Sequence, residues 1–316
     1  MRITMLCGGV GGAKLALGLS HVVEPDCLTI VVNTADDFEH LGLHISPDID
    51  TVIYTLAGLA NPILGWGRAD ETWGCMEILA DLGGETWFKL GDRDLAMHLR
   101  RTALLKSGMS LTEVTQLLSR RLGIGPTILP MTDGVVRTEL VTEAGILDFQ
   151  HYFVRNLCAP KLKSIRFKAT GNAKATDKVV EAISSNCDAV IIAPSNPFLS
   201  IDPILSLPGI RSSLSSAAIP VVAMAPIMGS SAFKGPTTKI MTELGIPVSA
   251  YELARYYCDF VDHYIVDKTD AHLIEAINGL GLAAEAVSIL MDNDEAKERL
   301  AQIALRAARS CCGRLP

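Results

Sequence analysis

The chain has 316 residues, of which 49% are hydrophobic and 20% are charged, and its formal net charge is −7. This length and composition fit one large α/β domain or two smaller ones and exclude wholesale disorder. The acidic balance argues against a duplex nucleic acid as partner, and no apolar run reaches the roughly 18 residues of a membrane span. Because the cysteines are scattered and no signal peptide is evident, we expect a cytoplasmic protein.

The first elements predict a βαβ unit. Ile3–Leu6 and Leu28–Val32 are short apolar runs that end in turn residues, and Ala13–Ser20 between them is compatible with a helix. Later strands are predicted at Ala189–Ala193, Val221–Ala225, Tyr264–Val266 and Val287–Leu290, and helices at Thr176–Ser184, Lys239–Leu244, Tyr251–Tyr257 and Ala271–Leu280. This alternation predicts a Rossmann-like, doubly wound α/β fold with a mainly parallel sheet that is covered on both faces.

The middle of the chain has a different pattern. Helical periodicity marks Ile49–Leu59, Thr72–Leu82, Asp94–Ser107 and Ser110–Leu122, and an antiparallel patch is predicted from Ile128–Met131, Val135–Val141 and Phe149–Val154. Ser110 and Glu113 form a capping box, residues 161–172 resemble a linker, and residues 292–309 predict a closing helix. We interpret residues 1–316 as a single domain in which about 72–165 form an inserted, lid-like subdomain over the active site.

A glycine-rich turn follows the first predicted strand. It has the sequence Gly8-Gly9-Val10-Gly11-Gly12-Ala13-Lys14, which matches neither the dinucleotide-binding fingerprint nor the P-loop. Backbone amides in such a turn can hold phosphate oxygens at the start of a helix. The candidate phosphate-binding residues are therefore Gly9, Val10, Gly11, Gly12 and Lys14. The alternatives are a turn that only packs tightly and a lysine that only faces solvent.

Four carboxylates lie within fifteen residues after the second strand. They belong to Asp36, Asp37, Asp48 and Asp50, and Asp48 or Asp50 is expected to cap a helix that begins near Thr51. One cap does not account for four carboxylates, and clustered hard oxygen ligands suit Mg²⁺. The alternative is a set of caps and solvated turn residues. His40 and His44 favour zinc only weakly, because Gly42 lies between them.

Weaker candidates follow later strands and a loop. Lys89, Arg93 and the aspartates of Gly91–Asp94 stand at a helix start, where Asp92 or Asp94 could be the N-cap. Ser195 and Asn196 follow one predicted strand and Lys234 lies beyond another, in the loops where a doubly wound sheet binds ligands. Trp66, Trp73 and Trp87 could stack on a planar ring, although core packing is the default explanation.

Taken together, these segments resemble the 2-phospho-L-lactate transferases of coenzyme F420 biosynthesis. The resemblance spans Met1 to about Asp267 and is carried by Gly8–Lys14, Asn33–Asp37, Ser46–Gly58, Trp87–Ala96, Leu129–Asp133, Ala193–Pro197 and Lys234–Pro236. It implies a Mg²⁺-dependent phosphotransferase. The terminal ribityl hydroxyl of the deazaflavin Fo would attack the phosphorus that carries the acid in an acid-diphospho-guanosine, and GMP would leave.

The resemblance also implies roles for individual residues. Asp50 and Lys89 correspond to the Fo-contacting positions. Charge neutralisation at a diphosphate agrees with this reaction, and some of Asp36, Asp37, Asp48 and Asp50 would hold Mg²⁺, with Asp50 as the candidate base for the hydroxyl proton. Lys89 stands where arginine is expected, and Gly134 stands where a second acidic residue is expected after Asp133. The acid could be 2-phospho-L-lactate, phosphoenolpyruvate or 3-phospho-D-glycerate. A homodimer is expected.

Two other functions remain open from the sequence. A nicotinamide-dependent oxidoreductase would use Asp36 to hold ribose hydroxyls, but it gives Ser46–Thr51 no role. A regulator that binds nucleotide sugars without catalysis, similar to gluconeogenesis-factor proteins, would differ after the second strand and lack the Trp87–Ala96 pattern.

Overall fold

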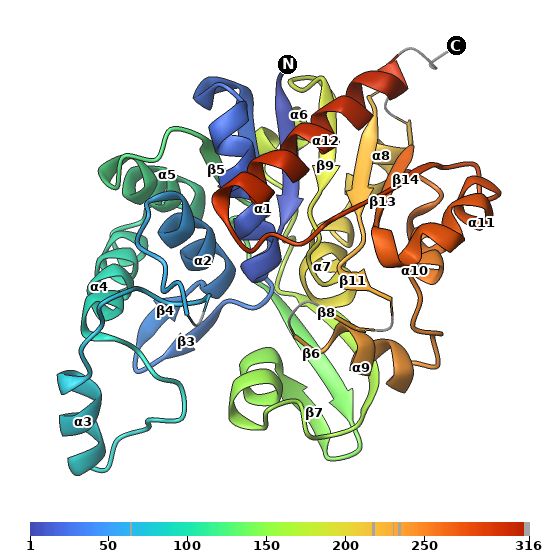
Figure 1. The fold of residues 1–316 in the computed structure, drawn as a ribbon. Helices are drawn as coiled ribbons and strands as arrows, with labels where there is room; N and C mark the ends of the chain where they lie inside the picture. The colour runs from blue at the N-terminus through green and yellow to red at the C-terminus, as the bar shows by residue number, and fades with distance from the viewer. Residues whose placement is uncertain (64, 217–218, 230, 233–234, 313–316) are drawn as a thin grey trace.

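The computed structural model describes residues 1–63, 65–216, 219–229, 231–232 and 235–312, and Figure 1 shows the arrangement of their helices and strands. The central sheet has seven strands in the order β14-β13-β10-β9-β1-β2-β5, and each neighbouring pair is parallel. These strands are β1 (Ile3–Cys7), β2 (Leu28–Val32), β5 (Thr127–Pro130), β9 (Ala189–Ile192), β10 (Val221–Met224), β13 (His263–Asp267) and β14 (Ala283–Val287). Because the inner strands are buried on both faces, they consist mainly of apolar residues. The predicted Rossmann-like α/β fold is confirmed.

Helices cover both faces of this sheet. On one face α1 (Gly9–Val22) packs against α12 (Asp294–Cys312), and Gly18 permits the contact because a Cβ there would overlap the Lys297 carbonyl. On the other face α6 (Asp177–Ser184) packs against α8 (Ile210–Ser216). Other helices are α7 (Asp202–Leu205), α9 (Thr237–Glu243), α10 (Ala250–Tyr257) and α11 (Ile274–Asn278). The 3₁₀-helical turns η1 (Pro25–Cys27) and η4 (Lys268–Leu273) and the π-helical turn η3 (Pro197–Ile201) lie between these elements and the strands. The predicted closing helix is confirmed.

Several smaller elements surround the carboxyl ends of the strands. Figure 1 shows the hairpin β3–β4, helix α3 and the sheet β7-β6-β8 below the central sheet. Their bounds, with those of the neighbouring elements, are β3 (Phe38–His40), β4 (Leu43–Ile45), α2 (Pro47–Leu56), α3 (Gly74–Asp81), α4 (Asp92–Lys106), α5 (Leu111–Arg121), β6 (Val136–Thr142), β7 (Gly145–Asp148), η2 (His151–Arg155), β8 (Leu162–Ala169), β11 (Ile227–Met228) and β12 (Ser231–Ala232). The capping box of Ser110 and Glu113 at α5 is confirmed.

Four local predictions are wrong. The run Ile128–Met131 was expected in an antiparallel patch, but β5 pairs in parallel with β2 and forms an edge of the main sheet. Phe149–Val154 contains a π-helical turn instead of a strand, and residues 161–172 contain β8 instead of a linker. The last strand ends at Val287 instead of beginning there, because β14 is a half-buried edge strand without an apolar run. That residues 72–165 act as a lid stays a prediction.

Within the described ranges, no helix combines the length and the apolar character that crossing a bilayer demands.

Candidate active site at the carboxyl end of the sheet

The glycine-rich turn lies where the strand order of the sheet reverses. β1 has β2 on one side and β9 on the other, and open α/β sheets bind ligands at such a point. A Cβ at Gly11 would lie 2.6 Å from the Pro194 carbonyl oxygen, and one at Gly12 would lie 2.8 Å from Ser195 Oγ. Ser195 Oγ also donates to the Gly8 carbonyl at 2.7 Å and accepts from the Gly8 amide at 3.2 Å. Two of the predicted phosphate-binding glycines, Gly11 and Gly12, are therefore needed to pack one loop against another.

Helix α1 begins inside this turn, at Gly9, and not at Ala13 as predicted. Gly9 has a φ of +63°, which glycine adopts without the strain of a side chain. The first amides of a helix have no acceptor within it, and they form its positive end. The Gly9 amide donates to Asp48 Oδ1 at 2.8 Å. A carboxylate therefore already occupies part of the predicted phosphate cradle, and the amides of Val10 and Gly11 are the next donors there.

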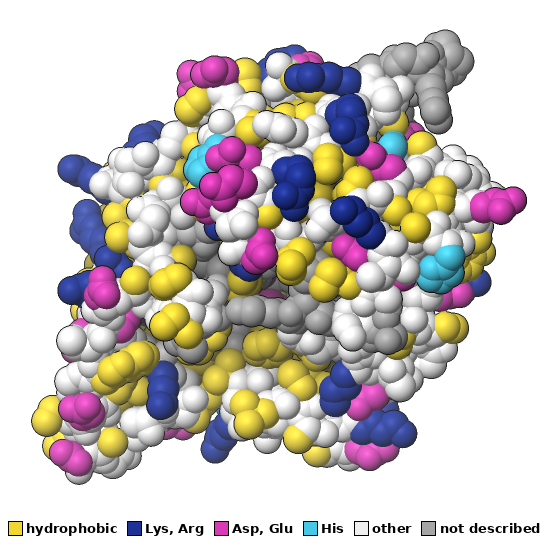
Figure 2. Space-filling view, viewed as in Figure 1, with side chains coloured by type: hydrophobic (Ala, Val, Ile, Leu, Met, Phe, Trp, Pro, Cys, Tyr) yellow, Lys and Arg dark blue, Asp and Glu magenta, His cyan; other side chains and the backbone are white. Residues whose placement is uncertain are grey.

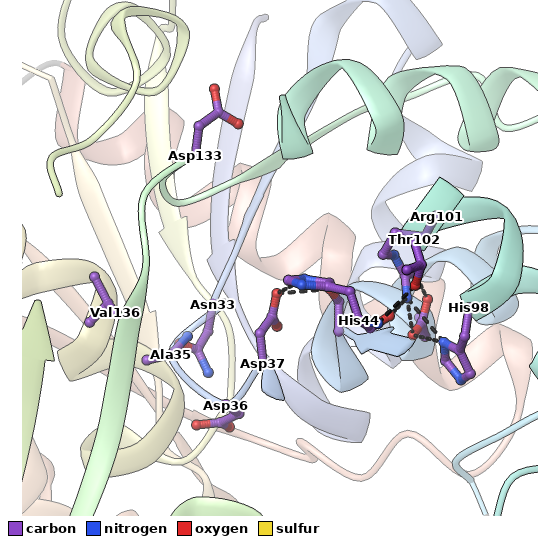
Figure 3. Close-up of polar contacts among 12 residues, drawn as sticks. Asn33, Ala35, Asp36, Asp37, His44, His98, Arg101, Thr102, Asp133 and Val136 are labelled. Carbon is purple, nitrogen blue, oxygen red and sulfur yellow. Dashed lines mark hydrogen bonds and ion pairs between the residues drawn. The ribbon is translucent and has the colours of Figure 1, made fainter. Parts of the chain in front are cut away.

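The predicted aspartates are buried around this helix end. Asp36 and Asp37 follow β2 (Figure 3). Asp48 and Asp50 belong to the first turn of α2. α2 begins at Pro47, so neither Asp48 nor Asp50 caps a helix starting near Thr51. That prediction was wrong because proline at the first helical position extends the helix toward the chain start.

Three of these carboxylates, those of Asp36, Asp37 and Asp48, accept hydrogen bonds from uncharged donors. Asp48 Oδ2 accepts from Asn33 Nδ2 at 2.9 Å, and Asp36 Oδ1 accepts from Thr138 Oγ1 at 3.2 Å. Asp37 Oδ2 accepts from Ser46 Oγ at 2.8 Å and lies 3.2 Å from His44 Nε2. Below, Asp36, Asp37 and Asp48 are called the acidic cluster.

The acidic cluster is electrostatically unfavourable as it stands. Burial raises the pKa of Asp48 to about 6, although its hydrogen bonds to Asn33 and the Gly9 amide lower it. Burial also raises the pKa of Asp36 well above its usual range, and repulsion from Asp48 raises it further. The causes are desolvation and like charge, both of which a bound cation would offset. The cluster is therefore suited to receive positive charge.

The donor atoms fit Mg²⁺ in a particular way. Asp37 Oδ1 and Thr34 Oγ1 are buried and have no hydrogen-bond partner within the part of the chain that the structure describes. Across that same part, no three His, Cys, Asp or Glu side chains converge as a complete metal site. Mg²⁺ commonly takes one or two carboxylates and completes its shell with water and phosphate oxygens. The cluster fits such a shared ion and does not form an all-protein cage.

Asp50 is in a different environment from the acidic cluster. Arg101 of α4 donates NH1 to Asp50 Oδ2 at 3.1 Å and NH2 to Asp50 Oδ1. The side chain of Arg101 is 1% exposed and that of Asp50 is 7% exposed. Figure 3 shows Arg101, His98 and Thr102 on α4, on the opposite side of His44 from Asp37. The structure therefore pairs Asp50 with an arginine and separates its chemistry from that of the acidic cluster.

The sequence interpretation did not identify Arg101 as a site residue. Arg101 lies four residues after Met97 and three before Leu104, and both of these side chains are buried in the core. These spacings place all three on one face of a helix. A charged residue on an apolar helix face predicts a buried partner, and this signal was available in the sequence.

Three other predicted residues are less closely tied to the aspartates. Lys14 Nζ donates to the Met291 carbonyl at 2.8 Å, so this conformation directs its ammonium to the segment before α12. Asn196 Oδ1 accepts from two amides of η3, at 3.0 and 3.1 Å, and so caps that turn. Lys89 is exposed beside the buried Leu90. Lys234 lies outside the described residues.

The helix start after Lys89 is capped in an unexpected way. Asp92 accepts from the first two amides of α3 at 3.1 and 3.0 Å and from Thr72 Oγ1 at 2.6 Å. Glu71 in turn accepts from the amides of Arg93 and Asp94 at 2.8 and 2.9 Å. The prediction that Asp92 or Asp94 is the N-cap of its own helix was wrong, because the N-cap is Gly91 and the two helices exchange caps. This exchange fixes the loop that carries Lys89 between α3 and α4.

An aromatic cluster joins the smaller elements below the sheet. Trp87 has its ring centroid 5.2 Å from that of His40 on β3 and 4.7 Å from that of His151 on η2. Phe38 and Phe88 complete the cluster at 4.8 Å from each other. Trp87 Nε1 and His40 Nε2 are buried with no hydrogen-bond partner among the described residues. His40 and His44 therefore have different partners, which does not favour a shared zinc ion.

The Asp133 region has a structural explanation. Asp133 Oδ1 accepts from the Thr112 amide at 2.7 Å, at the start of α5, and Figure 3 shows this side chain pointing away from Asp36 and Asp37. A Cβ at Gly134 would lie 2.8 Å from Ala173 Cβ, so a larger side chain there would require residue 173 to move. An open depression of about 470 Å³ lies beside these residues and is not lined by any of the four aspartates.

Comparison with known proteins decides the family. The sequence model of the family described as "2-phospho-L-lactate transferase CofD" matches residues 3–308. The chain belongs to this family. A phosphoenolpyruvate transferase from Kitasatospora aureofaciens is 40% identical over 315 residues, which cover 98% of each chain. A 2-phospho-L-lactate transferase from Methanosarcina mazei is 39% identical over 300 residues, which cover 95% of this chain and 98% of that protein.

A solved structure supports the fold independently of these sequences. A UPF0052-family protein from Bacillus halodurans matches with a TM-score of 0.62 at 16% identity, over 96% of this chain and 98% of that chain. At this identity the match shows the fold alone. The resemblance deduced from the sequence motifs is thus confirmed at the level of the family, and the protein is a transferase of that family.

Proposed function

We propose that this CofD-family transferase joins an acid-diphospho-guanosine to the deazaflavin Fo. The terminal ribityl hydroxyl oxygen of Fo attacks the phosphorus that carries the acid. A new P–O bond forms, the bond from that phosphorus to the GMP oxygen breaks, and the hydroxyl proton passes to a base or to solvent. The products are GMP and a phosphodiester of Fo with the acid.

One observation carries this proposal. Asp36 and Asp48 are buried carboxylates that repel one another beside the positive end of α1, at the point where the strand order reverses. A diphosphate at the amides of Val10 and Gly11 would bring more negative charge to this place. The arrangement is favourable only when a cation lies between the aspartate carboxylates and the phosphates of the donor. Metal-assisted transfer at a diphosphate fits this requirement, and the names of the two relatives support the same class of reaction.

The cofactor in this proposal is Mg²⁺. One or two of Asp36, Asp37 and Asp48 would hold it together with donor phosphate oxygens and water, and Asp37 Oδ1 supplies an oxygen that no described group already uses. Bound Mg²⁺ supplies neutralisation of the diphosphate charge. The protein's own residues supply placement: the α1 amides bind phosphate oxygens, and Asn33 and Ser46 orient the carboxylates.

The acceptor is proposed to lie on the side of Asp50 and Lys89. The aromatic cluster around Trp87 borders the loop that carries Lys89, and its two unpartnered ring nitrogens are polar groups suited to a heteroaromatic ligand. The carboxylate of Asp50 can accept from an acceptor hydroxyl. We also expect a homodimer, which light scattering during gel filtration would test.

The decisive assay combines purified protein, Fo, Mg²⁺ and one donor at a time, followed by the mass of the product. The donors carry phosphoenolpyruvate, 2-phospho-L-lactate or 3-phospho-D-glycerate, and relatives bearing the first two names are equally similar to this chain. Asp36→Asn should lower turnover by about 10²–10³-fold, because it removes charge from a preorganised site. The matched control is Asp26→Asn, which changes an exposed aspartate.

The same protein distinguishes the other two functions. Hydride transfer from a nicotinamide cofactor would favour the oxidoreductase. Asp36 is buried and bonded to Thr138, which does not favour a role in holding ribose hydroxyls. Binding of uridine-diphospho-N-acetylglucosamine in calorimetry, without transfer from any donor, would favour the regulator. Absence of transfer with all three donors, when Fo and GDP both bind, would refute the proposed reaction.

A further inference from the structure

The buried pair of Asp50 and Arg101 differs in kind from the acidic cluster. Both oxygens of Asp50 accept from one guanidinium group, and this two-point geometry is the strongest that arginine and carboxylate form. In the acidic cluster, by contrast, the ion-pair contact within the described ranges is that of Asp37 with the His44 ring, at 3.2 Å. Asp50 is therefore neutralised by the protein, whereas the acidic cluster depends on charge from a ligand.

Arg101 is held in place by further acceptors. Its NH1 lies 3.2 Å from His98 Nδ1 and 3.5 Å from the His44 carbonyl. A guanidinium only donates, so His98 Nδ1 is the acceptor in this contact. His98 Nε2 lies 3.2 Å from Asp94, whose other oxygen accepts from Tyr54 OH at 2.5 Å. Asp50, His98 Nδ1 and the His44 carbonyl thus all contact the guanidinium in the orientation that it has.

We propose that Arg101 is a positioning residue that fixes Asp50 as a hydrogen-bond acceptor for the acceptor substrate and withholds it from metal binding and proton abstraction. This inference rests on the proposed function. Each carboxylate oxygen retains one lone pair after the guanidinium has bound, which suffices for a hydroxyl or N–H of the acceptor. A carboxylate whose charge is already balanced gains little from a divalent cation. The metal is left to Asp36, Asp37 and Asp48.

The test separates binding of the acceptor from use of the metal. The variants are Asp50→Asn, Arg101→Met and Arg101→Lys, with Arg100→Met as the matched control on the exposed face of the same helix. For each variant we would measure the KM for Fo, kcat, and the Mg²⁺ concentration that gives half-maximal rate. Calorimetry would measure the affinities for Fo and for GDP with Mg²⁺.

Loss of a charge-assisted contact predicts a roughly ten- to hundredfold weaker affinity for Fo in Asp50→Asn and Arg101→Met. The kcat at saturating Fo should fall less than tenfold, and the Mg²⁺ requirement and GDP affinity should not change. Arg101→Lys should recover part of the loss, because it restores the charge without the planar fork. Arg100→Met should behave as the unmodified protein.

Two results would overturn the inference. The first is a kcat lower by a thousandfold or more in Asp50→Asn at unchanged KM for Fo, which would make Asp50 the base. The second is a clearly higher Mg²⁺ requirement in that variant, which would make Asp50 a metal ligand. If Arg101→Met does not fold, Asp50→Asn and Arg101→Lys decide alone. If the unmodified protein binds Fo but transfers nothing, the proposed function fails, and the Fo affinities of the variants still test the role of Arg101.

Discussion

Replacing Asp48 by asparagine should make the protein more stable at neutral pH and change the pH dependence of its stability. Folding raises the pKa of Asp48 from the ordinary 3.8 to about 6, mainly through burial. The unfolded chain therefore releases the proton at lower pH than the native protein. Because the native state binds more protons between these values, the free energy of unfolding falls as the pH rises through this window. The whole loss corresponds to about 3 kcal/mol and is complete above about pH 7.

Asp48→Asn removes this cost and keeps a side-chain oxygen that can accept from the Gly9 amide. The new amide nitrogen faces Asn33 Nδ2, and the lost hydrogen bond should cost about 1 kcal/mol. We therefore expect the variant to be about 2 kcal/mol more stable than the unmodified protein at pH 7.5 and about 1 kcal/mol less stable at pH 4. Urea unfolding followed by tryptophan fluorescence at both pH values measures this difference. A difference that does not depend on pH would refute the claim that Asp48 is buried as a strained carboxylate.

Other substitutions test separate parts of the structure. Arg101→Met leaves Asp50 as a buried charge and should cost about 3–5 kcal/mol in urea unfolding, whereas the double variant with Asp50→Asn should recover part of this loss. Gly11→Ala should lower stability by about 1–3 kcal/mol, because its Cβ would lie 2.6 Å from the Pro194 carbonyl; unchanged stability would contradict the close loop contact. Asp92→Ala should expose residues 74–81 to limited proteolysis, since the α3 amides lose their cap; unchanged cleavage would contradict the cap exchange. Binding of GDP with Mg²⁺ near pH 6 should release protons from Asp48, seen as different heats in buffers of different ionisation enthalpy; the release should be smaller in Asp48→Asn, and an unchanged release in that variant would contradict the assignment to Asp48.

The sequence was sufficient for the parts of this fold that depend on local pattern. The inner strands are apolar on both faces, so β1, β2, β9 and β10 could be located within one residue at either end. The edge strands of the sheet could not be located in this way. β14 is only half-buried and contains Glu285, and the partner of β5 depends on a pairing with β2 that no local pattern encodes.

The candidate site could be predicted in its residues but not in its connections. Four clustered aspartates and a glycine turn are visible in the sequence. The contact of Asp48 with the start of α1 cannot be seen in the sequence, because Gly9 and Asp48 are 39 positions apart. The separation of Asp50 from the other three aspartates could not be predicted either, because it depends on Arg101, which is 51 positions from Asp50. Only the apolar neighbours of Arg101 on its helix face indicated that this arginine would be buried and paired.

This division has a consequence for how the two halves of the site communicate. Arg101 binds Asp50, and the next residue, Thr102, accepts from the His44 amide at 2.8 Å through its Oγ1. The His44 ring contacts Asp37 in the acidic cluster. Helix α4 therefore contacts both halves through adjacent residues, and it begins directly after the loop that carries Lys89. A shift of α4 that closed this loop over an acceptor would move Asp50 and Asp37 together, because rigid helices transmit displacement to every side chain that they anchor. Acceptor binding is thus expected to affect metal binding only through a displacement of α4 and of His44, which contacts both halves of the site. Asp50→Asn and Arg101→Met leave α4 in place and should not change the Mg²⁺ requirement.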